Sequence, residues 1–294
     1  ISSELCPRYS GITITDLKVE ESPQWLQNKL LSIGIKPTNN VVDITNFVLH
    51  EIGQPLHAFD AEKIKGNKII IKTAKTDSVF TTLDGSEKSL SNEDLVISNQ
   101  TEPMCIAGVF GGLDSGVTED TTSIFLESAY FNPVTIRKTA KRHNLNTDAS
   151  FRYERGCDPN ITIYALKRAS VLIKDLCGGS ISSEIVDIYP QPIKNKSINF
   201  RFSSLNKIVG EEINKKLVID IIKFLEIGIE DESDELLKLS IPTYRVDVTR
   251  EIDVIEEVLR IYGFNEVRLP DKISTSISIK NEIESHDLKK IISN

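Results

Sequence analysis

One carboxylate of this chain, that of Glu127, lies in an apolar segment where burial disfavours a charged group. Glu127 lies in the middle of an apolar run that extends from Ile124 to Phe131. A strand of this composition is expected to be buried, and a buried carboxylate needs a partner or a task. Three interpretations stay open: an acid paired with an arginine, a general base, or an acceptor for a ligand hydroxyl.

The segment after this run is basic, although the chain as a whole is acidic. Asn132 and Pro133 open a predicted helix over residues 133–143. Between residues 137 and 155, two acids stand against six basic residues: Arg137, Lys138, Lys141, Arg142, Arg152 and Arg155. Such a surplus suits contacts with the phosphates of a polyanion. A solvated helix face is the alternative interpretation.

A second reactive side chain is His57, in the sequence GQPLHAFD. We expect it on a loop controlled by Gly53 and Pro55, after a helix over 40–50. Near neutral pH, a histidine placed there can bind a substrate or orient water. A structural histidine is the other interpretation. The structural interpretation is stronger for His143, which ends a helix, where a cation favours the helix dipole.

The glycine-dense sequence AGVFGG at residues 107–112 lacks the lysine of a phosphate-binding loop. It indicates either a close approach of backbone to a ligand or a simple tight bend. Serine or cysteine nucleophile motifs and HExxH are absent from the sequence. Any hydrolysis would therefore depend on positioned water.

Four acids gather in the sequence near the start of a predicted helix over about 250–262: Asp247, Asp253, Glu256 and Glu257. Oxygen ligands that converge in this way would suit Mg²⁺. Acids in a first helical turn also complement the helix dipole without any metal.

The bulk properties describe a globular chain of 294 residues with a net charge of −8. That charge argues against wholesale coating of nucleic acid but allows a local basic patch. The four cysteines include no CxxC pair, so we expect reduced thiols and a cytoplasmic location. No apolar run is long enough for a membrane helix. Because the chain begins with Ile1 and shows no signal peptide, we expect it to be part of a longer protein.

The element pattern predicts an α+β protein with two main units. The first, over residues 1–190, is sheet-rich and sandwich-like with flanking helices. Its helices are expected over 22–34, 40–50, 133–143 and 159–177, and its strands at 68–74, 79–83, 95–98, 104–110 and 123–131. Ser22 is expected to cap the first helix. A linker at 189–197 leads to a small winged-helix-like, α-rich unit over 198–272, and residues 276–294 are expected to begin a further domain.

Six motifs occur together in order: GQPLHAFD, AGVFGG, FLESAYFNP, IRKTAKRH, NTDASFRYERGCDP and PTYRVDVTREIDVIEEVLRIYGF. In this combination the chain closely resembles the β subunit of bacterial phenylalanine–tRNA ligase. The likeness covers essentially residues 1–275. It implies a B3/B4 editing domain followed by a B5 domain and then the truncated start of a catalytic-like domain.

The resemblance implies hydrolytic editing of tyrosyl-tRNA(Phe), an aminoacyl-tRNA ester hydrolase activity. Glu127 would accept the tyrosine hydroxyl, and His57 with Thr45 and Asn46 would hold water at the ester. Gly108, Thr147 and Ala149 would shape the amino-acid pocket. The basic helix, with Arg137, Lys138, Lys141 and Arg142, would lie near the tRNA acceptor end.

The resemblance also implies partners and cofactors. The partners are an α subunit and tRNA(Phe), in an (αβ)₂ heterotetramer. ATP would be used in the α subunit, where phenylalanyl-tRNA is made, so this chain alone should not aminoacylate. The four acids Asp247, Asp253, Glu256 and Glu257 would form a magnesium site shared with that subunit. Two other hypotheses are a non-catalytic module that binds tRNA or the α subunit, and a freestanding metal-dependent hydrolase.

Overall fold

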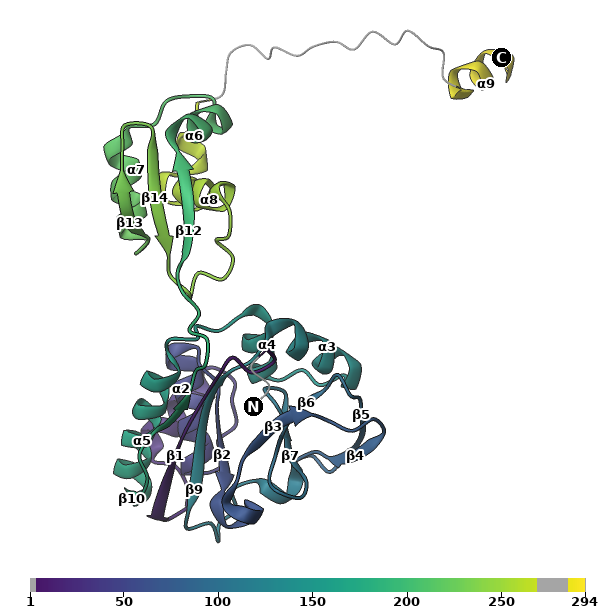
Figure 1. Ribbon diagram of the computed structural model, residues 1–294, viewed down its shortest axis with the longest axis vertical. Coiled ribbons are helices and arrows are strands. Elements are labelled where there is room, and N and C mark those ends of the chain that lie inside the picture. Colours follow the sequence, from purple (N-terminus) through teal and green to yellow (C-terminus); the bar gives the residue numbers. More distant parts are fainter. Residues whose placement is uncertain (1–3, 269–284, 294) are drawn as a thin grey trace.

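The computed structural model describes residues 4–268 and 285–293, and Figure 1 shows their arrangement. A central antiparallel sheet runs in the order β10-β1-β9-β2, and a further strand, β11, also pairs with β1. Its strands are β1 (Arg8–Leu17), β2 (Leu56–Asp60), β9 (Ile124–Tyr130), β10 (Gly178–Ile181) and β11 (Val186–Ile188). Three helices form one core with this sheet: α1 (Gln24–Ser32), α2 (Asn40–Ile52) and α5 (Thr162–Cys177).

The opposite face of the central sheet packs on a second group of strands (Figure 1). A four-stranded antiparallel sheet there has the order β3-β6-β7-β8, and β4 pairs with β5. These strands are β3 (Ile70–Thr73), β4 (Ser78–Thr81), β5 (Glu87–Leu90), β6 (Leu95–Ser98), β7 (Pro103–Ile106) and β8 (Phe110–Gly111). Two helices join this core: α3 (Pro133–His143) and α4 (Asp148–Arg155). Short 3₁₀ turns are η1 (Ala61–Lys63), η2 (Lys65–Asn67) and η3 (Leu113–Ser115).

Strand β9 separates these two cores. Successive side chains of a strand point to opposite faces. Accordingly Ile124 and Leu126 pack with the helices, whereas Phe125 and Ala129 pack with the second group of strands. Glu127 shares the face of Phe125 and Ala129, between the two sheets. The apolar run therefore carries its carboxylate toward the interior of the first unit.

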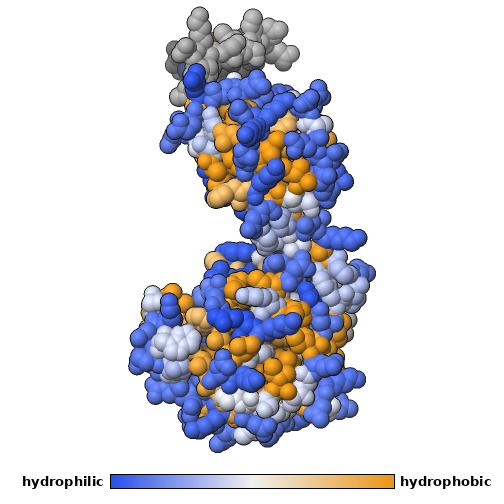
Figure 2. All heavy atoms as spheres, turned by 90° about the vertical axis from the view of Figure 1, so that its left-hand side faces the viewer, coloured by the Kyte–Doolittle hydropathy of each residue, from blue (hydrophilic) through white to orange (hydrophobic). Residues whose placement is uncertain are grey.

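The second unit has its own core, built from residues between Ile198 and Val267. Its elements are β12 (Lys196–Arg201), α6 (Phe202–Val209), α7 (Lys215–Phe224), β13 (Gly228–Glu232), β14 (Leu236–Ile241), α8 (Glu251–Tyr262) and η4 (Phe264–Glu266). The three strands form an antiparallel sheet in the order β12-β14-β13. Near the end of the chain, α9 spans Ser285–Ser293. On the face in Figure 2, hydrophobic surface gathers over both units.

The α+β class predicted from the sequence is confirmed, and the second unit has the order strand, helix, helix, hairpin, helix. The predicted helix over 133–143 and the strand at 95–98 occur with those bounds. A turn that contains Asp84 and Gly85 joins β4 and β5 in a hairpin. Most of the predicted further domain at 276–294 lies outside the described residues.

Several local predictions are wrong. Pro23 takes the N-cap position of α1 without a side-chain cap, because the Ser22 hydroxyl donates instead to the buried Asp43 at 2.6 Å. The expected strand over 104–110 is two strands, since Gly108 turns the chain at a φ of 67°. His57 lies on β2 rather than on a loop. The patterns of β1, β10, β11 and α4 were not recognised.

Candidate active site

Two adjoining cavities lie beside Glu127. The larger has a volume of about 500 Å³ and the smaller one of about 70 Å³. Both are lined by His57, Gly111 and Ala149. The larger is also lined by Thr45, Asn46 and Thr147, and the smaller by Gly108 and Glu127. The structure therefore brings together the seven residues predicted to act on the substrate.

Glu127 is only 4% exposed and makes no ion pair among the described residues. The arginine-pair interpretation is therefore wrong. Its Oε2 accepts a hydrogen bond of 2.9 Å from the Tyr9 hydroxyl, and its Oε1 has no hydrogen-bond partner in the described part of the chain. Burial raises the pKa of this carboxyl to about 8, and the bond from Tyr9 opposes that shift.

His57 lies directly opposite Glu127 in the pairing of β2 with β9. Side chains of directly paired residues stand on the same face of a sheet, so both groups point toward the cavities. The imidazole packs edge-on against Phe59, with ring centroids 4.4 Å apart. Its Nε2 is buried without a hydrogen-bond partner, and burial lowers the pKa of His57 to about 4. At neutral pH the ring is therefore uncharged and has an unused polar atom.

The glycine-rich segment between β7 and β8 forms one wall of the cavities. A Cβ at Gly108 would come within 2.9 Å of both Phe131 and Tyr153, so the backbone packs closely on two aromatic rings. A Cβ at Gly111 would lie 3.1 Å from Cε1 of His57 and 2.8 Å from Leu83. The bend predicted for this sequence is therefore present, and a close approach of its backbone to a ligand stays a prediction.

The start of helix α4 also lines the cavities. Thr147 caps the helix by accepting from the Ser150 backbone amide at 3.0 Å. Its hydroxyl also lies 2.9 Å from the Val109 carbonyl oxygen, to which it donates. Thr147 therefore joins the start of α4 to the glycine-rich segment and helps to position Ala149, which lines both cavities.

Helix α2 contributes Thr45 and Asn46 to the larger cavity. The Thr45 hydroxyl donates to the Val42 carbonyl at 2.7 Å, one turn earlier in the helix. Thr45 therefore presents mainly its methyl group for packing, while Asn46 supplies an amide.

A cysteine also lines the smaller cavity but is a poor nucleophile. The Cys105 thiol donates to the Phe110 carbonyl at 3.3 Å, and burial raises its pKa well above the ordinary value. Only a thiolate attacks readily. The chemistry open to this site is recognition of a hydroxyl group at Glu127 and placement of water near His57.

The four basic residues predicted to bind tRNA lie on α3, and none of them lines the two cavities. Arg142 pairs with Glu93 and with the buried Asp94. Arg137 donates to the Glu154 carbonyl at 2.9 Å. Lys138 and Lys141 are exposed, and neither makes an ion pair within the described residues. Two cations therefore remain available to a polyanion.

Two of the four acids of the second unit pair with arginines. Asp253 pairs with Arg250 at 2.8 Å and accepts from the backbone amides of Thr249 and Arg250. Glu257 pairs with Arg245 and Arg260. No group of three or more ligating side chains in the described part of the chain could hold a metal ion by itself. The magnesium site of Asp247, Asp253, Glu256 and Glu257 shared with a second subunit stays a prediction.

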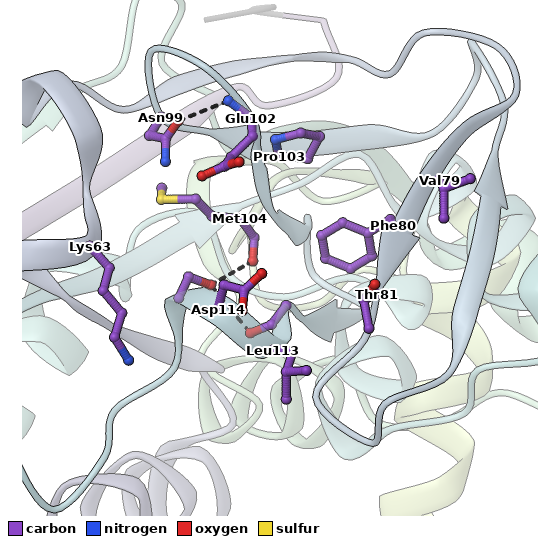
Figure 3. Close-up of a pocket in the computed structure, with 12 residues that line it drawn as sticks. Lys63, Val79, Phe80, Thr81, Asn99, Glu102, Pro103, Met104, Leu113 and Asp114 are labelled. Carbon is purple, nitrogen blue, oxygen red and sulfur yellow. Dashed lines mark hydrogen bonds between the residues drawn. The ribbon is translucent and has the colours of Figure 1, made fainter.

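A separate cavity of about 170 Å³ lies between β4, β7 and η3. Figure 3 shows Phe80, Met104 and Asp114 around it, with Lys63 at one side. None of the predicted site residues lines this cavity. It has no link to the chemistry of Glu127 and His57.

Sequence reasoning missed three polar residues of the site. Tyr9 holds Glu127, and the Tyr153 hydroxyl lies 3.2 Å from the Ala129 carbonyl. The Gln54 amide donates to the same carbonyl at 2.8 Å. Gln54 and Tyr153 carried a signal, because they stand in the motifs GQPLHAFD and NTDASFRYERGCDP, whereas Tyr9 stands in none. The pairing that brings Tyr9 to Glu127 spans 118 positions of the chain.

Comparison with known proteins identifies two families along the chain. Residues 5–178 match the B3/4 domain, and residues 198–264 match the tRNA synthetase B5 domain. The chain is 52% identical over 292 residues to a protein named phenylalanine–tRNA ligase β subunit from Bacteroides fragilis strain YCH46. This match covers 99% of the chain and 36% of the relative. A protein of the same name from Geobacter metallireducens is 42% identical over 265 residues, covering 90% of the chain and 33% of the relative.

The chain thus spans about a third of the length of these relatives. Among solved structures, an N-terminal fragment of the phenylalanyl-tRNA synthetase β subunit from Pyrococcus horikoshii is similar at 16% identity and a TM-score of 0.41. That likeness covers 88% of this chain and 72% of the other. In the described residues, no helix has the length and apolar content needed to cross a membrane.

Proposed function

The chain belongs to the family of phenylalanine–tRNA ligase β subunits, of which it carries the B3/4 and B5 domains, and we propose from this that it edits mischarged tRNA. The substrate would be tyrosyl-tRNA(Phe), whose ester is hydrolysed. This activity would support the synthesis of phenylalanyl-tRNA by an α subunit that uses ATP. The observation that carries the proposal is a buried carboxyl without an ionic partner beside a cavity.

The proposal rests on how a hydroxyl group is recognised. A synthetic pocket that fits phenylalanine rejects tyrosine weakly, because hydrophobic pockets reject an added hydroxyl by only about 10². A second site that requires the hydroxyl discriminates better, because a bare ring would leave a buried polar atom unpaired. Glu127 Oε1 has no partner in the described residues, and a bare ring bound in the smaller cavity would leave it unpaired.

The phenol suits Glu127 in either protonation state. With a pKa raised to about 8, the carboxyl is mostly protonated at neutral pH. A phenol hydroxyl both donates and accepts, so it pairs with a carboxylate oxygen or with a carboxylic O–H. Phenylalanine has no hydroxyl group and can make neither of these hydrogen bonds. Gly108 and Ala149, which line the smaller cavity, would bound the aromatic ring.

His57 is proposed to hold the water that attacks the ester carbonyl. Its neutral ring offers Nε2, which has no partner of its own. Attack forms a C–O bond between the water and the ester carbonyl carbon, and the bond from that carbon to the ribose oxygen of the tRNA breaks. The proton that the water loses balances the proton that the ribose oxygen takes up. Asn46, on the wall of the larger cavity, would assist in binding the terminal nucleotide, with Thr45 and Thr147 shaping that wall.

The remaining parts of the assembly are also proposals. Lys138 and Lys141 on α3 would contact phosphates near the acceptor end, while Arg137 and Arg142 already hold protein partners. The partners would be the α subunit and tRNA(Phe), in an (αβ)₂ enzyme of the cytoplasm. A magnesium ion shared with the α subunit would be held at Asp247, Asp253, Glu256 and Glu257, with that subunit completing the ligands, since the described residues of this chain supply no complete metal site.

The test is hydrolysis of tyrosyl-tRNA(Phe) by the αβ enzyme that contains this chain, with phenylalanyl-tRNA(Phe) as the comparison substrate. We expect the wild type to hydrolyse the tyrosyl ester selectively. Glu127→Ala should lose the selectivity by about 10²-fold or more, since a hydrogen bond to a buried charged or polar group is removed. Equal selectivity in the variant would show that Glu127 does not recognise the hydroxyl.

A non-catalytic scaffold is the second candidate, favoured by exposed apolar side chains on the second unit. Phe224 is 75% exposed, and Ile208 and Leu217 are also exposed. Surfaces of this kind often serve protein interfaces. Binding of tRNA and α subunit without ester hydrolysis, unchanged by His57→Ala, would support the scaffold over the hydrolase. A loss of hydrolysis on chelation, with no requirement for tRNA, would instead indicate a metal-dependent hydrolase.

A further inference from the structure

The hydroxyl of Tyr9 already occupies one oxygen of the carboxyl that the proposed function needs. The donor and Oε2 of Glu127 are 2.9 Å apart, and both side chains are buried. Tyr9 lies on β1 opposite Ala129, so it reaches Glu127 diagonally across the same face of the sheet. The bond joins two neighbouring strands of the central sheet, so the rigid backbone fixes both ends.

We propose that Tyr9 is a specificity-determining positioning residue: its hydroxyl holds Glu127 Oε2 and leaves Oε1 as the single atom of the carboxyl that pairs with a substrate hydroxyl. This inference rests on the proposed editing function. Without Tyr9 the carboxyl would rotate about its terminal bond, and neither oxygen would have a defined position. When a phenylalanyl ring binds, the freed carboxyl could then rotate to another partner instead of leaving Oε1 unpaired. The enzyme would therefore reject phenylalanine less strongly.

The neighbours of the carboxyl support the assignment to Tyr9. Among the described residues, the titratable groups that contact or electrostatically influence Glu127, or face it across the sheet, come from five places in the fold: Cys6 before β1, Tyr9 on β1, His57 on β2, Cys105 on β7 and Tyr153 on α4. Of these, only Tyr9 makes a hydrogen bond to Glu127. Tyr153 directs its hydroxyl to the carbonyl oxygens of Pro55 and Ala129.

Tyr9 also lines a second cavity of about 550 Å³, together with Phe125 and Ile71. Tyr9→Phe would keep the ring among these residues and remove only the hydroxyl.

The test compares Tyr9→Phe with Tyr130→Phe, a control that removes the hydroxyl of a partly buried tyrosine that lines neither cavity of the site. The first readout needs no substrate. Carbon-13 NMR follows the carboxyl titration of Glu127, assigned by its absence in Glu127→Gln. We expect a higher pKa of Glu127 in Tyr9→Phe, because a bond that favours the charged form is lost, and the wild-type value in Tyr130→Phe.

The second readout is the selectivity of the αβ enzyme for tyrosyl over phenylalanyl ester. Tyr9→Phe should reduce it about tenfold, the effect of losing one buried hydrogen bond. An unchanged pKa of Glu127, an equal shift in Tyr130→Phe, or full selectivity in Tyr9→Phe would each overturn the proposal. A wild-type enzyme without any selectivity would instead overturn the editing function, and the titration would still decide whether Tyr9 controls Glu127.

Discussion

Glu127 and His57 face each other across neighbouring strands, and burial moves their pKa values in opposite directions. Burial favours the uncharged form of each, so the acid keeps its proton and the imidazole loses its own. The cavities therefore hold two polar but mostly neutral groups at pH 7. Such a pair binds a neutral phenol and a water molecule without a net charge to be compensated.

This arrangement predicts how Glu127 affects stability as the pH changes. Its folded pKa of about 8 lies above the ordinary value of 4.5. Its contribution is therefore fully present below pH 4.5 and is lost as the pH rises toward 8. We expect Glu127→Gln to become more stable relative to wild type across pH 5 to 8, by up to about 1.4 kcal/mol per pH unit.

Urea denaturation at several pH values checks this expectation. The contribution of His57 is common to both proteins and cancels in the difference. Glu119→Gln, at an exposed carboxylate, serves as the control for loss of a charge. A difference between Glu127→Gln and wild type that does not vary with pH would mean that Glu127 is ionised in the folded chain.

His57 predicts a pH dependence of hydrolysis rather than of stability. Since its pKa is lowered to about 4, the ring stays neutral throughout pH 5 to 7. The tyrosyl-ester hydrolysis rate, corrected for the reaction without enzyme, should not fall with a midpoint near 6.5. His57→Ala should lower the rate by about 10² or more, and His57→Gln, which keeps an amide near the Nε2 position, should lose less. A midpoint near 6.5 in the wild type would contradict a buried neutral ring.

At the scale of elements, Thr147 connects two walls of the site. It caps α4 and donates to Val109 in the glycine-rich segment. Thr147→Ala should reduce the free energy of unfolding by about 1 kcal/mol, because an N-cap acceptor is lost. Thr147→Ser keeps the hydroxyl and should retain most of that stability. Urea denaturation of both variants measures the difference, and equal losses would assign the effect to the methyl group instead.

The elements also show what the sequence could predict. The strand around Glu127 and the helix over 133–143 could be predicted from the sequence. The apolar residues of a strand and the N-cap residue of a helix are features of a short segment. His57 was placed on a loop because Gly53 and Pro55 precede it. In fact its strand exists through pairing with β9, which is distant in sequence. Helix α4 was missed because its eight residues are mainly polar and its cap bonds to another segment.

The candidate site could be predicted only in part, because some of its contacts depend on pairing between distant strands. The resemblance of several motifs to a known family indicated the residues that line the cavities. The partner of Glu127 was not predictable, because Tyr9 reaches it through strand pairing across the sheet. The four acids of the second unit are close in sequence, yet helix capping and nearby arginines engage two of them, Asp253 and Glu257.

At the scale of the whole molecule, the described residues form three cores, and the third draws on residues 198–267 alone. The connecting segment 189–195 has no regular secondary structure, and Lys194 within it is exposed. Few hydrogen bonds join the two units, among them those of Thr243 with Asp158 and Asn160. A separate core and a thin connection are typical of units that fold independently.

We therefore expect brief treatment with trypsin to cut after Lys194 and to leave both pieces folded, because exposed irregular segments are preferred sites of proteolysis. Mass spectrometry should detect a piece that begins at Asn195, and Lys194→Gln should slow its appearance. The two pieces should separate on gel filtration, since isolated hydrogen bonds between units contribute only about 1 kcal/mol each. Each piece should keep its far-UV circular dichroism and a cooperative thermal transition. Loss of structure in the larger piece after this cut would mean that the site around Glu127 needs the second unit to fold.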